Sequence, residues 1–169
     1  MDAHGLIMAG GRSKRMRATG SNLHKALVHV SGMPMIERNM RYLAQWGFRD
    51  FTIAVSANEP QLLAYLQNDG LELATSLSAT FRVIVEQEPL GNIGVVRDIA
   101  FTESLLVVYV DNLTTLPLGP LTEKHRAAAA DLTIAAHLEP VRLDYGELVV
   151  EGEMTNRPLG CFVLLRFHA

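Results

Sequence analysis

Along this chain, short apolar runs alternate with stretches in which apolar residues recur at helical spacing. Runs typical of buried strands occupy residues 6–9, 51–55, 81–85, 105–110 and 132–137. Helical patterns fall between them, over residues 35–46, 60–68, about 93–101 and 118–129. Because strands that alternate with helices of this length form βαβ units, the pattern predicts an α/β fold with a mostly parallel central sheet.

The clearest helical pattern is that of residues 35–46. Its apolar positions Met35, Ile36, Met40 and Leu43 lie on one face of a helix, and Pro34 is well placed to open it. This helix follows the first strand, so it is expected to pack on the sheet.

Composition and charge narrow the class of protein. The 169 residues are 49% hydrophobic and 20% charged, which is ordinary for a globular chain and suits one domain spanning residues 1–169. The net charge of −3 argues against a general nucleic-acid binder. No apolar run is long enough to span a bilayer and no signal peptide precedes the first strand, so we expect a cytoplasmic protein without membrane contact.

The first predicted strand runs into a glycine pair, Gly10 and Gly11, followed closely by four cations, Arg12, Lys14, Arg15 and Arg17. Glycines let backbone N–H groups approach a ligand, and cations neutralise phosphate oxygens, so this loop suggests a nucleoside triphosphate. The Walker A and dinucleotide-binding motifs are both absent, since neither Gly-Lys-Ser/Thr nor a third glycine follows. A plain strand-to-turn junction with solvated cations is the alternative interpretation.

A further cation, Lys25, stands fourteen residues after Gly11. The apolar residues around it indicate that its segment is anchored, so it can offer a positive charge on a flexible stem to a phosphate, while Arg15 can bind phosphate through two bonds. The six histidines show no metal-binding spacing and are interpreted as structural or exposed.

Parallel strands end at a common edge of the sheet, where ligands bind in folds of this class. That rule places residues 10–15, residues 86–94 and Asp111 together. Asp111 ends an apolar strand and suits Mg²⁺, which in phosphate chemistry takes one or two carboxylates. A turn or helix cap is the alternative role for this residue.

Glu86 begins a loop that Pro89 and Gly91 shape into a turn. A carboxylate there could accept two N–H bonds from the Watson–Crick edge of guanine, whereas uracil or thymine offers only one such donor. The alternative is an acidic loop without a ligand.

Four blocks occur in order along the chain: AGGRSKRM, HKALVHVSGMPMIER, EQEPLGNIGVV and LLVVYVDN. Together they resemble the sugar-1-phosphate nucleotidyltransferases, also called nucleotide-sugar pyrophosphorylases, and are most similar to the mannose- or heptose-1-phosphate guanylyltransferase type. The resemblance covers residues 3 to about 150. It implies the nucleotide-diphospho-sugar transferase fold, a Rossmann-like three-layer α/β/α arrangement with a mostly parallel sheet.

The resemblance also implies a reaction, in which an oxygen of a sugar 1-phosphate attacks the α-phosphorus of an NTP, GTP being the first choice, and pyrophosphate leaves. It implies Mg²⁺ as cofactor and a protein that works by positioning and charge neutralisation. It assigns nucleotide binding to Gly10, Gly11, Glu86 and Gly91, catalysis to Arg15 and Lys25, metal binding to Asp111, and substrate binding to Gly146 and Arg157.

Several positions depart from the family pattern. His24 replaces the proline before the lysine, and Val110 replaces the glycine before the aspartate. The region after about residue 150 is shortened and offers no candidate for a second metal carboxylate, and the strand edge that this would expose favours a homo-oligomer. Two functions therefore stay open: an active guanylyltransferase, and a non-catalytic nucleotide or nucleotide-sugar binding protein or truncated inactive member of the family.

Overall fold

The computed structural model describes residues 3–11, 23–91, 93–101 and 104–136, and the backbone of residues 162–166. Its strands are β1 (His4–Ala9), β2 (His29–Val30), β3 (Met33–Pro34), β4 (Asp50–Ser56), β5 (Thr80–Glu86), β6 (Ser104–Tyr109), β7 (Leu132–Ala135) and β8 (Phe162–Arg166). Its helices are α2 (Met35–Gln45), α3 (Pro60–Gln67), α4 (Asp69–Ser76) and α5 (Leu118–Ala127), with the 3-10 helices η1 (Lys25–Leu27) and η2 (Gly94–Asp98).

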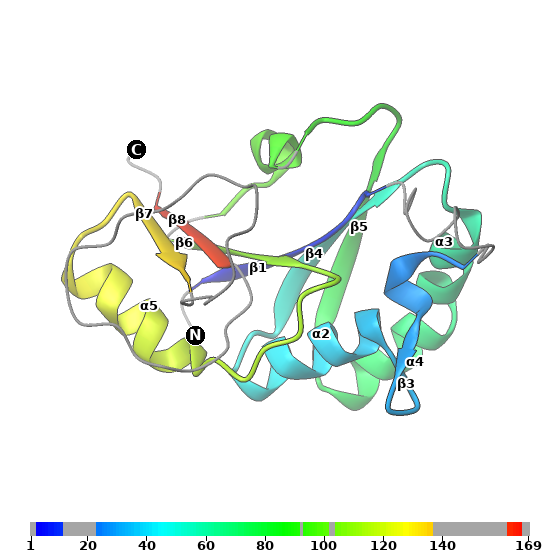
Figure 1. The fold of residues 1–169 in the computed structure, drawn as a ribbon, viewed down its shortest axis with the longest axis horizontal. Coiled ribbons are helices and arrows are strands. Elements are labelled where there is room, and N and C mark those ends of the chain that lie inside the picture. Colours follow the sequence, from blue (N-terminus) through cyan, green and yellow to red (C-terminus); the bar gives the residue numbers. More distant parts are fainter. Residues whose placement is uncertain (1–2, 12–22, 92, 102–103, 137–161, 167–169) are drawn as a thin grey trace, which may run out of the picture.

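Six strands form one sheet in the order β5-β4-β1-β6-β8-β7 (Figure 1). The first four, β5, β4, β1 and β6, are parallel to one another, whereas β8 pairs antiparallel with both β6 and β7. The α/β prediction with a mostly parallel sheet is therefore confirmed, and the insertion of β8 is the feature that the pattern did not show.

The period-two alternation of β1 divides the core between the two faces of the sheet. Ile7 and Ala9 face a cluster that includes the apolar stripe of α2, while Leu6 and Met8 face a second cluster with Val95 and Ile99. Helices α2 to α5 accordingly lie on one side of the sheet, and η2 lies on the other (Figure 1).

The predicted strands agree with the structure to within two residues at each end, and the prediction for α2 is too long by one residue. Gly47 ends α2 in the left-handed region, at φ 85°, and its N–H bonds to the Ala44 carbonyl at 3.0 Å. Of the described helices, none combines the length and the apolar character needed to cross a membrane.

Two helix predictions differ from the structure. Instead of one helix over residues 93–101 there is the short 3-10 helix η2, because Val95, Val96 and Ile99 are β-branched and disfavour an α-helix. The helix over residues 60–68 is found as α3, but α4 follows it directly and was missed. Asn68 breaks the helical path with φ −118° and ψ −93°, so the turn signal there concealed a second helix.

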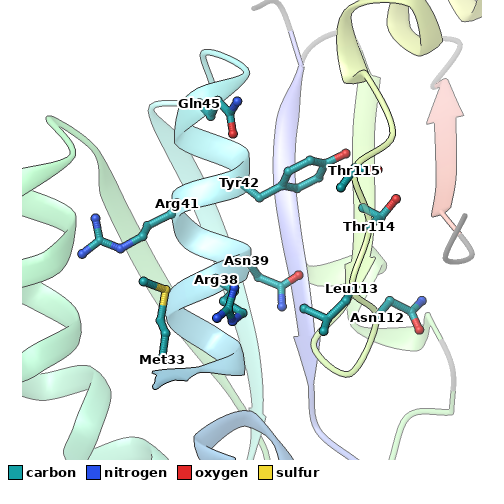
Figure 2. Close-up of a pocket in the computed structure, with 10 residues that line it drawn as sticks. All are labelled: Met33, Arg38, Asn39, Arg41, Tyr42, Gln45, Asn112, Leu113, Thr114 and Thr115. Carbon is teal, nitrogen blue, oxygen red and sulfur yellow. The ribbon is translucent and has the colours of Figure 1, made fainter. Parts of the chain in front are cut away.

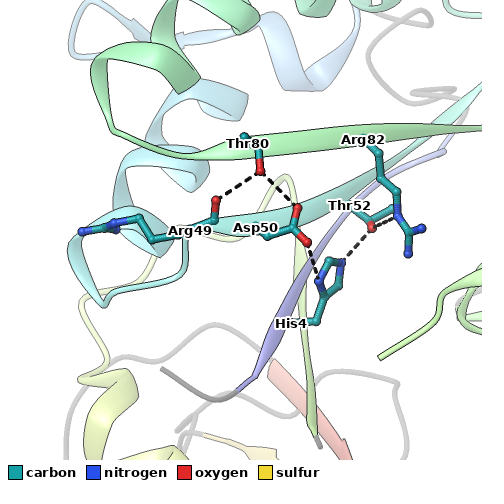
Figure 3. A network of polar contacts seen from close by, with 6 residues as sticks. All are labelled: His4, Arg49, Asp50, Thr52, Thr80 and Arg82. Atoms are coloured by element: carbon teal, nitrogen blue, oxygen red, sulfur yellow. Dashed lines mark hydrogen bonds and ion pairs between the residues drawn. The ribbon is translucent and has the colours of Figure 1, made fainter. Parts of the chain in front are cut away.

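At the amino ends of the strands, a polar network joins β1, β4 and β5 (Figure 3). His4 Nε2 lies 2.8 Å from Thr52 Oγ1, which also accepts a bond from Arg82 Nε at 3.0 Å. His4 Nδ1 lies 3.6 Å from Asp50 Oδ2, and Thr80 Oγ1 donates to Asp50 Oδ1 at 3.3 Å. Burial is the main cause that lowers the pKa of His4, and Arg82 adds to it, while Asp50 opposes it.

Candidate functional site

The candidate site lies at the carboxyl ends of the parallel strands, where the order of the sheet reverses. From β1 the chain proceeds to β4 and β5 on one side, and β6 lies on the other side. Sheets of this kind bind ligands at such a switch point. The structure brings five predicted site residues into contact there, and they are Gly10, Gly11, Lys25, Glu86 and Asp111.

The glycine pair lies between two charged side chains. A Cβ atom on Gly10 would stand 2.1 Å from Glu86 Oε2, and one on Gly11 would stand 3.2 Å from Lys25 Nζ. Neither position accepts a larger residue without movement of its charged neighbour. The glycines therefore allow these two charged side chains to pack closely against the backbone.

Glu86 is buried, with 7% of its surface exposed, although it ends the edge strand β5. Its Oε1 atom has no hydrogen-bond partner among the described residues. Burial raises the pKa of this carboxyl group. A buried acceptor without a partner is unfavourable until a donor from a ligand or from water meets it, so Glu86 is a clear candidate for a ligand contact at this edge.

Lys25 and Asp111 form an ion pair across 86 residues of sequence, with Nζ 2.9 Å from Oδ2. The Lys25 side chain is 22% exposed and that of Asp111 is 52% exposed, so both can be reached from solvent. Ala26 and Leu27 are buried beside Lys25 in η1, which confirms that its segment is anchored.

His24, immediately before Lys25, is 2% exposed and connects the glycine pair to η1. Its Nδ1 accepts a bond from the Ala26 N–H at 3.1 Å, and its Nε2 lies 3.0 Å from the Gly11 carbonyl oxygen. The interpretation of this histidine as structural is confirmed, but its place inside the site was missed. The signal was its position next to Lys25, where the family pattern has proline.

Asn39 is a second polar residue of the site region that sequence reasoning missed. Its Nδ2 donates to the Val110 carbonyl at 3.1 Å and to the Met35 carbonyl at 2.9 Å. Because Val110 precedes Asp111, this contact holds the start of the metal-candidate segment against α2. An asparagine on the apolar stripe of α2 was the available signal.

The remaining predicted residues are placed as follows. Gly91 lies in the loop after β5 with φ 79°, and a Cβ there would meet nothing within 4 Å, so its glycine serves the conformation of the turn. Arg15, Gly146 and Arg157 lie outside the described residues, and their roles stay predictions.

In the described part of the chain, Asp111 is the one residue predicted to bind a metal. No group of three or more His, Cys, Asp or Glu side chains there could hold a metal ion. Mg²⁺ commonly binds one or two carboxylates and takes its other ligands from phosphates and water. An exposed carboxylate paired with a lysine is compatible with that mode.

A cavity of about 550 Å³ lies beside this site, between α2 and the segment after β6 (Figure 2). It is lined by Met33, Arg38, Asn39, Arg41, Tyr42, Gln45, Asn112, Leu113, Thr114 and Thr115. Tyr42, one of these lining residues, donates a hydrogen bond to the Leu116 carbonyl. None of the predicted site residues lines it, so the cavity runs along α2 and the candidate site stays at the strand ends.

Comparisons with known proteins agree with this geometry. A family model described as a MobA-like NTP transferase domain matches residues 5–139. A D-glycero-alpha-D-manno-heptose 1-phosphate guanylyltransferase of Aneurinibacillus thermoaerophilus is 27% identical over 141 residues, covering 81% of this chain and 57% of that protein. A mannose-1-phosphate guanyltransferase of Yarrowia lipolytica is 30% identical over 153 residues, covering 86% of this chain and 40% of that protein.

A UTP–glucose-1-phosphate uridylyltransferase of Synechocystis is 25% identical over 158 residues, covering 86% of this chain and 40% of that protein. The chain thus spans well under two thirds of the length of these relatives. Among solved structures, HddC from Yersinia pseudotuberculosis superimposes with a TM-score of 0.69 at 20% identity, covering 96% of this chain and 76% of that one. That likeness confirms the Rossmann-like α/β fold.

Proposed function

This chain belongs to the MobA-like NTP transferase domain family, and on that premise we propose that it transfers a nucleoside monophosphate from an NTP to a sugar 1-phosphate. We propose GTP as the donor, so that the products are a GDP-sugar and pyrophosphate. One observation carries the proposal: Glu86, Gly10, Gly11, Lys25 and Asp111 form a continuous row of contacts along the carboxyl edge of the sheet.

The row has two chemically different ends. At one end a buried acceptor faces the glycine pair, which suits the N–H donors of a flat nucleobase. At the other end an accessible cation and an accessible carboxylate suit phosphate and metal. A nucleoside triphosphate bound along the glycines would place its base at Glu86 and its phosphates at Lys25 and Asp111.

The chemistry asks little covalent work of the protein. An oxygen of the sugar 1-phosphate forms a bond to the α-phosphorus, the bond from that phosphorus to the bridging oxygen breaks, and pyrophosphate leaves. Lys25 holds the phosphate under attack, and Arg15, in the role that the family resemblance implies, stabilises the charge of the departing pyrophosphate. Fixed positive charges of this kind act by positioning and by neutralising developing charge.

Lys25 and Asp111 neutralise each other at 2.9 Å. A triphosphate bound to Lys25 would free Asp111 from this pair. Asp111 would then be the residue that holds Mg²⁺, which would supply further neutralisation of the phosphate oxygens. Exchange of partners is inexpensive, because an ion pair at this degree of exposure contributes at most about 1 kcal/mol.

The choice of guanine rests on Glu86. An ionised Glu86 can accept from both N–H donors of the guanine Watson–Crick edge, and these bonds favour its charged form against the burial that raises its pKa. Uracil offers one such donor. The two guanylyltransferase relatives support guanine, and the uridylyltransferase relative makes UTP the donor against which it is tested.

Pyrophosphate release tests the proposal. The protein is incubated with Mg²⁺ and a pool of sugar 1-phosphates, with GTP compared against ATP, UTP, CTP and dTTP. We expect sugar-dependent release with GTP, and Arg15→Ala should reduce it by orders of magnitude while the protein stays folded. Equal turnover in that variant would reject the role of Arg15.

The second function left open gives a different result in the same experiment. A protein that binds GTP in calorimetry but releases no pyrophosphate with any sugar 1-phosphate is a nucleotide-binding or inactive member of the family. Both outcomes are tested because this chain spans 57% and 40% of the length of two guanylyltransferase relatives.

A further inference from the structure

The imidazole of His24 is the one side chain among the described contacts that bonds both to the glycine pair and to the turn that carries Lys25. It reaches the Gly11 carbonyl oxygen at 3.0 Å and the Ala26 N–H at 3.1 Å, and it is 2% exposed. Its two bonds span thirteen residues of sequence on one side and two on the other. The ring thus connects two short segments that lie on opposite sides of Lys25 in the chain.

We propose that His24 is a positioning residue of the nucleotide site, which holds the Gly11 backbone and the Lys25 turn at a fixed separation. This inference rests on the proposed function, because the separation matters for a triphosphate that contacts both. His24 does not itself touch the reacting atoms. It acts through the glycine pair and Lys25.

The chemistry of the ring fixes which nitrogen carries its proton. A backbone N–H can only donate, so Nδ1, which receives the Ala26 N–H, carries no hydrogen. The neutral ring then has its hydrogen on Nε2, which donates to the Gly11 carbonyl oxygen. Both nitrogens are occupied in complementary roles, as in a built joint between two backbone segments.

This link between the two segments matters because ordering either of them costs conformational entropy. Glycines lose more conformational freedom on ordering than other residues, and the Lys25 stem has several rotatable bonds. A site that is ordered before the ligand arrives avoids part of the entropy loss of binding. His24 is therefore expected to increase triphosphate affinity without contributing a contact to the ligand.

Three substitutions separate the two bonds of the ring. His24→Asn keeps an acceptor near the Nδ1 position, so it retains the bond from Ala26, but its side chain is too short to reach Gly11. His24→Gln places an amide N–H at the distance of Nε2 and can retain the bond to Gly11. His24→Ala loses both. The matched control is His29→Asn, on an exposed position of β2.

Two measurements are made on each variant after its thermal melt shows a folded protein. Calorimetry gives the affinity for GTP with Mg²⁺ and for inorganic triphosphate, which reports the phosphate part alone. Backbone ¹⁵N relaxation gives the order of the Gly11 amide without any ligand. We expect His24→Asn to bind both probes about 2- to 10-fold more weakly, the range of one hydrogen bond, with a less ordered Gly11. His24→Gln should lie near wild type in both measurements, because residue 24 is joined to Lys25 through the chain and its bond to Gly11 alone then keeps the two segments together.

The outcomes distinguish the inference from the function on which it rests. Wild-type affinity and wild-type Gly11 order in His24→Asn would overturn the role of His24 while leaving the proposed function intact. A loss in His24→Gln equal to that in His24→Asn would overturn it as well, because the Gly11 bond would then not be the cause. A wild-type protein that binds neither probe would overturn the proposed function and the His24 proposal with it.

Discussion

Two carboxylates stand at the same edge of the sheet, one at the end of β5 and one in the region after β6, and their surroundings are opposite. Glu86 is 7% exposed, lies against Gly10, and leaves Oε1 without a partner in the described structure. Asp111 has a side chain that is 52% exposed and paired with Lys25 at 2.9 Å. The same functional group is therefore prepared for two kinds of ligand.

The different burial of the two carboxylates suits them to different kinds of ligand contact at one edge of the sheet. A buried acceptor discriminates, because every donor that it fails to meet leaves it unpaired in a poorly solvated place. An exposed ion pair exchanges partners readily, because water and a counter-charge replace what is lost. We therefore propose Glu86 for recognition of the base and Asp111 for contact with phosphate and metal.

The largest expected effect is that of Asp111→Asn. Loss of the charge should reduce Mg²⁺-dependent pyrophosphate release about 100-fold or more, as for other groups that act on developing charge. The melting temperature should hardly change, because the pair with Lys25 is partly exposed. The double variant with Lys25→Ala should fall little further than either single variant, since residues that act as a unit are not additive.

Asp98→Asn is the matched control, because Asp98 is an exposed carboxylate paired with Arg97 at 3.4 Å, outside the site. Its release rate should equal that of the wild type. Full Mg²⁺-dependent activity in Asp111→Asn would show that the region after β6 does not carry the metal.

Glu86→Gln should alter both base preference and stability, whereas Asp111→Asn should alter activity alone. We expect the GTP-over-UTP ratio of kcat/KM to fall about 10- to 100-fold, the effect of one charged hydrogen-bond partner. Without nucleotide, the variant should be more stable at neutral pH by about 1 kcal/mol, because a neutral amide loses less on burial than a carboxylate. Parallel kinetics with the two nucleotides and thermal melts measure both quantities.

The stability gain of Glu86→Gln has a defined pH window. The folded-state pKa of Glu86 is raised above its ordinary 4.5, so the folded protein retains a proton that the unfolded chain has released. Wild-type stability therefore falls as pH rises through that interval. The difference between variant and wild type should be near zero at pH 4 and grow toward neutral pH. Glu88→Gln, on the exposed part of the same loop, should show neither effect.

Periodicity predicted the strands, and the carboxyl-edge rule placed residues 10–15, residues 86–94 and Asp111 together, because both depend on local patterns and on strand direction. The roles of these residues and of Lys25 came from the family resemblance, and the pattern could not supply them. What it could not predict was contact between particular side chains. Glu86 reaches Gly10 past the intervening strand β4, and Lys25 meets Asp111 across 86 residues. These contacts depend on side-chain reach and packing, which the linear pattern does not contain.

The errors have two origins. The helix over residues 93–101 was expected from apolar spacing, but β-branched side chains limit it to η2. His24 was read as a residue type without metal spacing, yet its importance comes from two backbone groups that fold around it. A hydrogen bond to a backbone group does not depend on the residue type of the partner, so the sequence does not reveal it.

Alanine substitutions at Gly10 and Gly11 should affect the Glu86 end and the Lys25 end of the site separately. Their effects should be smaller than those of Asp111→Asn and Glu86→Gln. Gly10→Ala forces the Glu86 carboxylate away, since its Cβ would stand 2.1 Å from Oε2, so the preference for GTP over UTP should fall several-fold. Gly11→Ala meets Lys25 Nζ at 3.2 Å and should weaken all nucleotides equally, about 2- to 5-fold, because only the phosphate end is displaced.

A double-variant comparison checks the first of these effects. In a Glu86→Ala background the displaced carboxylate is absent, so Gly10→Ala should change base preference no further. An unchanged effect of Gly10→Ala in that background would mean that the glycine acts through the backbone and not through Glu86.

The smallest expected effect comes from His4, at the amino ends of the strands, and it is needed to measure the Glu86 window correctly. The folded-state pKa of His4 is lowered from its ordinary 6.5, mainly by burial, so the unfolded chain binds a proton more readily than the folded protein. Stability therefore falls as pH drops below about 6.5, which is opposite in sign to the Glu86 slope and overlaps it. His4→Asn should flatten the acid side of the melting-temperature profile, and the exposed His29→Asn should not. If the profile between pH 4.5 and 6.5 is the same in His4→Asn as in the wild type, the network in Figure 3 carries no proton-linked stability, and the whole slope belongs to other groups.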